Sequence, residues 1–159
     1  VLPDPLRELS RAELLARVEA LLDALAPGPT RACYEARWLD QRAYAALHPP
    51  GGAPLDEARL RGARQLYAAI ASGTGIAFVE FRRSHGLAYC AWRLGELERA
   101  RALARAACEH AGDGGLIRFR AMALRLLARL SADDEAARLR ERADRLARQI
   151  EHEDLLDGT

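Results

Sequence analysis

Clusters of glycine and proline divide the 159-residue chain into segments that are each long enough for one helix. The clearest breaks are Pro27-Gly28-Pro29 and the stretches 48–54 (HPPGGAP), 72–75 (SGTG) and 112–115 (GDGG). Because proline lacks a backbone N–H and glycine favours turns, we expect no helix to cross them. Between the breaks, apolar residues recur every three or four positions, which is typical of amphipathic helices. No segment alternates as a strand does, so the sequence predicts an all-α fold.

The breaks and the periodicity together predict about seven helices in one domain spanning residues 1–159. The expected ranges are 10–26, 30–47, 55–71, 76–94, 96–111 and 116–130, and a last helix capped at 131–133 that continues to about 152. Thr30 is the expected N-cap of the second helix, because its hydroxyl oxygen can accept a backbone N–H bond. The short connections imply antiparallel neighbouring helices.

The charge balance gives no overall reason to expect a nucleic acid or membrane partner. All 24 basic residues are arginine and 23 residues are acidic, for a net charge of +1. Residues 58–95 hold six arginines and one acid. No zinc finger, DNA-binding helix-turn-helix motif or aromatic stacking platform accompanies them. No apolar run approaches the roughly 20 residues that a membrane-spanning helix needs. We therefore expect neither nucleic acid nor membrane binding.

The cysteines indicate the cellular compartment, and the amino-acid composition indicates the kind of genome. Cys33, Cys90 and Cys108 form an odd set without CxxC spacing, so we expect reduced thiols in a cytoplasmic protein. The absence of lysine and asparagine, beside abundant alanine and leucine, is typical of a bacterium with a GC-rich genome. The chain begins with valine, and we expect it to belong to a longer protein.

The motifs that could support catalysis are incomplete. The stretch 72–75 (SGTG) matches neither phosphate-binding glycine motif and follows no predicted strand. Cys108 and His110 are two residues apart, so on a helix they point in different directions and make poor joint metal ligands. We therefore expect no catalytic residues, no metal site and no cofactor, and we do not expect an enzyme.

The stretch 81–107 is rich in alanine, and three of its alanines are spaced around a glycine turn, namely Ala88, Ala100 and Ala107 around Gly95. This spacing resembles the tetratricopeptide repeat, a helix–turn–helix unit of about 34 residues. With Gly95 at repeat position 15, the alanines take positions 8, 20 and 27, where the family keeps small residues. Ser84 and Ala91 depart from the bulky residues usual at positions 4 and 11.

A second unit follows 36 residues later, where Ala136 and Ala143 repeat Ala100 and Ala107 while Leu124 matches position 8 poorly. The resemblance thus covers residues 80–150 as two units, with 1–79 as degenerate helical hairpins. It implies antiparallel hairpins stacked as an α-solenoid, serving protein–protein interaction in a bacterial regulatory or signalling protein. The alternative is a compact helical bundle that oligomerises or binds a small ligand as a sensor domain.

The resemblance also places a partner-binding surface, because the first helix of each repeat lines a concave groove. The matching residues are Arg82, His85, Tyr89, Trp92 and Arg93 in the first unit and Arg118, Arg125 and Arg129 in the second. Helical spacing alone puts the first five on one stripe. Arginine binds carboxylates through paired hydrogen bonds, so this surface suits an acidic peptide or a C-terminal carboxylate. Alternatively, Tyr89 and Trp92 belong to the core and the arginines to the solvated exterior.

The last helix carries Leu139, Ala143, Leu146 and Ile150 at 4-3-4 spacing. Such a stripe suits a terminal capping helix packed on its neighbour. It also suits a short seam in a homodimer.

Overall fold

The computed structural model describes the backbone of residues 11–49 and 54–156 and the side chains of residues 13–49 and 54–150. Within these ranges the chain forms seven α-helices and no strand, which confirms the predicted all-helical class. The helices are α1 (Arg11–Ala24), α2 (Pro29–Leu47), α3 (Glu57–Ala69), α4 (Ala77–Arg93), α5 (Leu97–Asp113), α6 (Ile117–Arg129) and α7 (Asp133–Leu156). Ser10, the expected first helical residue, and most of the 48–54 loop lie outside the described residues.

The helix ends differ from the sequence prediction in instructive ways. Helix α2 begins at Pro29 with Gly28 as its N-cap, so the prediction of Thr30 as N-cap is wrong. Proline fits the first turn because its φ is preset and its missing N–H would have no intrahelical partner there. Helix α3 is capped by Asp56, whose carboxylate accepts the backbone N–H of Arg59 at 2.8 Å. Helix α7 continues past its predicted end to Leu156.

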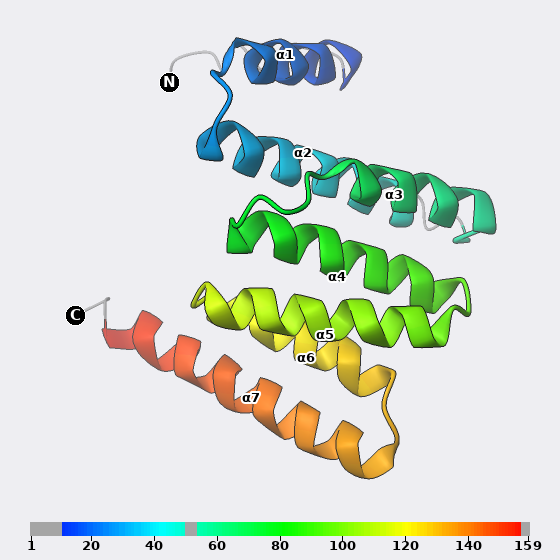
Figure 1. Cartoon of the computed structure of the whole chain (residues 1–159), viewed down its shortest axis with the longest axis vertical. Helices are drawn as coiled ribbons and strands as arrows, with labels where there is room; N and C mark the ends of the chain where they lie inside the picture. The colour runs from blue at the N-terminus through cyan, green and yellow to red at the C-terminus, as the bar shows by residue number, and fades with distance from the viewer. Residues whose placement is uncertain (1–10, 50–53, 157–159) are drawn as a thin grey trace, which may run out of the picture.

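Consecutive helices run in opposite directions and follow one another along the longest axis of the molecule, from α1 at one end to α7 at the other (Figure 1). Each helix packs against its neighbours in the chain, and α4 also contacts both α2 and α6. Among the described residues, no helix packs against one that is more than two places away in the sequence. The first and last helices therefore do not meet.

Two glycine turns of the same geometry join α4 to α5 and α5 to α6. Gly95 and Gly115 have φ of 79° and 65°, a region that residues with a Cβ rarely adopt. The N–H of Glu96 donates to the carbonyl of Ala91, and the N–H of Leu116 donates to that of Ala111, both at 2.9 Å. This is the Schellman arrangement, in which glycine lets the chain reverse directly after a helix.

Alanines occupy the contact between α4 and α5. The side chains of Ala88, Ala100, Ala104 and Ala107 have no exposed surface. A methyl group lets two helix backbones approach closely, since the spacing between packed helices depends on the side chains at their contact. The alanine-rich sequence thus sets a close α4–α5 pair, against which α6 and α7 pack.

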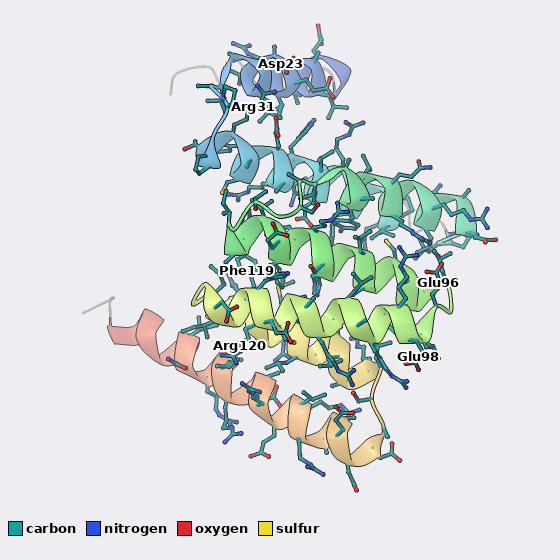
Figure 2. All side chains as sticks on the ribbon, in the orientation of Figure 1. Asp23, Arg31, Glu96, Glu98, Phe119 and Arg120 are labelled. Carbon is teal, nitrogen blue, oxygen red and sulfur yellow. The ribbon has the colours of Figure 1, made fainter. Side chains whose placement is uncertain are left out.

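The two ends of the chain of helices are held differently. In the described part of the chain, helix α1 contacts only α2. Ion pairs join Arg31 to Asp23 at 3.5 Å (Figure 2) and Arg42 to Glu19 at 3.4 Å. At the other end, Ala143 of α7 is fully buried and Leu139 packs against the core. This favours the capping use of the α7 stripe, while a dimer through α7 stays a prediction.

Candidate functional site

A buried ion pair joins α2 to α4. Nη1 of Arg82 donates to Oδ2 of Asp40 at 2.8 Å, and the two side chains are only 20% and 13% exposed. The guanidinium carbon of Arg82 also lies 5.2 Å from the ring centre of Phe78 and 4.8 Å from that of Phe119 on α6. Its Nε is buried and has no hydrogen-bond partner among the described residues. Ring faces attract cations, which offsets part of the cost of burying this charge.

Tyr67 of α3 completes this buried polar cluster. Its ring is 5% exposed and lies directly against Gly86 of α4. Its hydroxyl lies near Asp40, whose pKa is raised by burial while the positive charge of Arg82 opposes that rise. Burial and the nearby Asp40 charge raise the pKa of Tyr67 as well. Three helices thus contribute one group each to a buried polar cluster, in which Arg82 and Asp40 form the ion pair.

A cavity of about 370 Å³ opens above this cluster. Its lining includes Asp40, Tyr44 and His48 of α2, Tyr67 of α3, His85 and Tyr89 of α4, and Met122 of α6. The rings of Tyr44 and His48 stack with their centres 4.1 Å apart. Tyr44 and Met122 are 55% and 41% exposed, which makes them two of the five exposed large apolar side chains among the described residues.

A second cluster lies beside the cavity and is built on Trp92. The guanidinium carbons of Arg93 and Arg129 lie 5.9 Å and 5.5 Å from its ring centre. Arg93 also donates to the hydroxyl of Tyr89 at 3.3 Å. Since Tyr89 lines the cavity as well, the cavity and the Trp92 cluster form one continuous surface over α4 and α6.

The structure brings some of the sequence-predicted site residues together and leaves others apart. Tyr89, Trp92, Arg93 and Arg129 form the Trp92 cluster, while Arg82 and His85 line the cavity. Arg125 instead pairs with Asp144 of α7 at 3.2 Å. Arg118 is exposed near the start of α6.

The basic stretch 58–95 is largely neutralised by acids that lie outside it. Arg59 and Arg61 pair with Asp56 and Glu57, Arg64 with Glu96, and Arg82 with Asp40. Arg83 donates to the backbone carbonyls of Ala68 and Ile70. Among its six arginines, only Arg93 has neither an acidic nor a carbonyl partner in the described part of the chain. This reduces further the case for nucleic acid, which is bound largely through unpaired cations.

The sequence reasoning missed Asp40, Tyr44, Tyr67 and Met122. Asp40 did leave a readable signal, because Ala36, Asp40, Ala43 and Leu47 follow one another at 4-3-4 spacing on the buried face of α2. A lone acid within an apolar stripe requires a buried partner. The sequence does not say which of the arginines supplies it.

His85 is packed rather than fully solvated. Its ring stacks on that of Phe81 with centres 5.2 Å apart, and burial, aided by the charge of Arg82, lowers its pKa to about 4. The unfolded chain takes up this proton near pH 6.5, so the stability that neutral His85 supports is present above about pH 6.5 and is lost as the pH falls toward 4.

Replacing His85 with phenylalanine should therefore reduce the acid sensitivity of the fold. Between pH 7 and pH 4.5 we expect the wild type to lose about 2 kcal/mol more unfolding free energy than His85→Phe, because only the wild type carries the titrating ring. Urea unfolding at the two pH values measures this difference. Equal losses in the two proteins would contradict the packed, neutral histidine.

No protein-family model matches the chain, and neither a curated protein nor a solved structure was found to match it significantly. None of the described helices is long and apolar enough to cross a membrane. In the same part of the chain, no three histidine, cysteine, aspartate or glutamate side chains are grouped so that they could hold a metal ion.

Proposed function

We propose that the chain is a tetratricopeptide-like interaction module that binds an acidic segment of a partner protein on the surface formed by α2, α4 and α6. The burial of the repeat positions supports this. Ala88, Ala100 and Ala107 are 0% exposed, and the corresponding Leu124, Ala136 and Ala143 are 2%, 2% and 0% exposed. The resemblance further suggests a cytoplasmic, bacterial regulatory or signalling protein as the setting.

The helix contacts support an open array over a closed bundle. In a closed bundle the first and last helices pack on a common core. Among the helices that the structure describes, α1 contacts only α2, and α7 packs on α6. Contacts confined to near neighbours are typical of repeat arrays, which use extended surfaces for binding.

The observation that carries the proposal is the pair of arginines on Trp92. Arg93 and Arg129 come from different helices and approach one indole ring, and no carboxylate among the described residues pairs with either of them. Trp92 is half-buried and packs against the core. Two guanidinium groups beside this ring provide charge for acidic side chains, and the ring provides apolar area for the segment that carries them.

Charge reversal at this pair tests the proposal with defined peptides. The acidic peptide has nine residues, with a central phenylalanine, two glutamates on each side of it and serines elsewhere; the neutral peptide has glutamine in place of glutamate. We expect the chain to bind the acidic peptide at least ten-fold more tightly, and Arg93→Glu/Arg129→Glu to lose this preference. The fluorescence of Trp92, measured in a Trp38→Phe background, reports binding.

Arg138→Glu/Arg140→Glu is the matched control, since it changes the net charge equally on the exposed surface of α7. It should retain the preference for the acidic peptide. Equal affinity for both peptides, or an equal loss in the control variant, would contradict acidic recognition at Trp92.

A further inference from the structure

We propose that the cavity above Asp40 and Arg82 receives an aromatic side chain of the partner segment, next to the acidic residues that contact Arg93 and Arg129. This inference rests on the proposed function and specifies the partner: a segment with one aromatic ring close to acidic residues. The cavity supplies the anchor and the Trp92 cluster supplies the charge recognition.

The lining of the cavity favours a ring. Tyr44, His48 and Tyr89 present aromatic surface, and Met122 presents a thioether at the same cavity. Aromatic rings pack well against one another and against methionine sulfur. Tyr44 and Met122 leave large apolar areas in water, and a bound ring would cover them. The cavity volume of about 370 Å³ lies in the range of pockets that enclose such groups.

The floor of the cavity favours a neutral occupant. Asp40 is paired with Arg82, so neither charge of the pair needs a ligand to balance it. A cationic occupant would approach Arg82, and an anionic one would approach Asp40. An uncharged ring avoids both repulsions. Because Asp40 and Arg82 are already paired with each other, they lose little hydration energy when a bound ring displaces water from the cavity.

The cavity is continuous with the site proposed for the acidic residues. Tyr89 lines the cavity and receives a hydrogen bond from Arg93, whose guanidinium also lies against Trp92. An extended segment advances about 3.3 Å per residue. Residues a few positions from an inserted ring would therefore reach Arg93 and Arg129, which is why the acidic and aromatic features belong to one segment.

The test compares two peptides that differ only at the ring. The first is the acidic peptide with central phenylalanine, and the second has alanine at that position with the same four glutamates. We expect the full 159-residue chain to bind the phenylalanine peptide at least ten-fold more tightly. The Tyr44→Ala variant should lose this preference while still binding the alanine peptide as the wild type does.

Tyr34→Ala is the matched control, because Tyr34 and Tyr44 are both on α2 and both 55% exposed, yet only Tyr44 lines the cavity. Tyr34→Ala should keep the preference for phenylalanine. Helical circular dichroism and urea unfolding check that both variants fold.

The outcomes separate this inference from the proposed function. Binding that depends on Arg93 and Arg129 but not on the phenylalanine would overturn the cavity proposal and leave acidic recognition standing. A phenylalanine preference that survives Tyr44→Ala would also overturn it. If N-acetylphenylalanine amide alone bound as tightly as the peptide, the cavity would be a small-molecule site instead. No binding by either peptide would overturn both.

Discussion

Replacing Gly86 with alanine is expected to lower the free energy of unfolding by about 3 kcal/mol. A Cβ atom on Gly86 would lie 2.1 Å from Cδ1 of Tyr67 and 2.3 Å from its Cε1. Tyr67 is buried and belongs to the core cluster, so its ring cannot move aside without disturbing the packing around it. Urea unfolding followed by circular dichroism measures the loss.

Gly62→Ala is the control for this prediction. Gly62 lies within α3, and a Cβ there would meet no atom within 4 Å. Since alanine favours a helix over glycine by up to about 1 kcal/mol, Gly62→Ala should stabilise the protein. Effects of the same sign at both glycines would show that Gly86 is not needed for the approach of Tyr67.

Replacing Asp40 with leucine is expected to cost about 3 kcal/mol of unfolding free energy at pH 7. The substitution leaves the guanidinium of Arg82 mostly buried and without its hydrogen bond to Asp40. Arginine stays protonated in proteins, so it cannot escape this cost by losing its charge. Urea unfolding at pH 7 measures the effect.

Arg82→Met should cost less than Asp40→Leu, and its cost should fall as the pH is lowered. Burial already raises the pKa of Asp40 and the charge of Arg82 opposes that rise. Without Arg82 the carboxyl takes up a proton more readily, and a neutral acid is easier to bury. Urea unfolding of the wild type and Arg82→Met at pH 7 and pH 4.5 measures the cost of the substitution at each pH. A larger loss of unfolding free energy at pH 4.5 than at pH 7 would contradict this prediction.

The double variant Asp40→Leu/Arg82→Met provides the coupling control. Removing both charges leaves no unpaired buried ion, so much of the lost stability should return. Costs that simply add would show that the two side chains do not stabilise each other in the folded protein.

The sequence predicted one side of the candidate site and missed the other. Tyr89, Trp92, Arg93 and Arg129 were placed on one surface by helical spacing and the repeat resemblance, and they do lie together. The α2 side of the cavity was not foreseen. Nothing in the spacing relates Tyr44 to α4 across the chain break at 48–54.

Arg125 illustrates the limit of the same reasoning within one helix. It lies on α6 one turn before Arg129, and the repeat pattern treats the two alike. In the fold Arg125 pairs with Asp144 of α7, whereas Arg129 lies over Trp92 of α4. The small difference in direction around the helix axis sends them to different neighbours.

The sequence by itself determined the seven helices, their order and their antiparallel course, because periodicity and helix breaks depend on residues within a turn or two of each other. The pairing of Asp40 with Arg82, 42 residues away, was decided only by the tertiary structure. So were the neutralisation of the basic stretch and the contact of Tyr67 with Gly86. These depend on which helices stack and how each is rotated about its axis, and the local sequence does not encode that rotation.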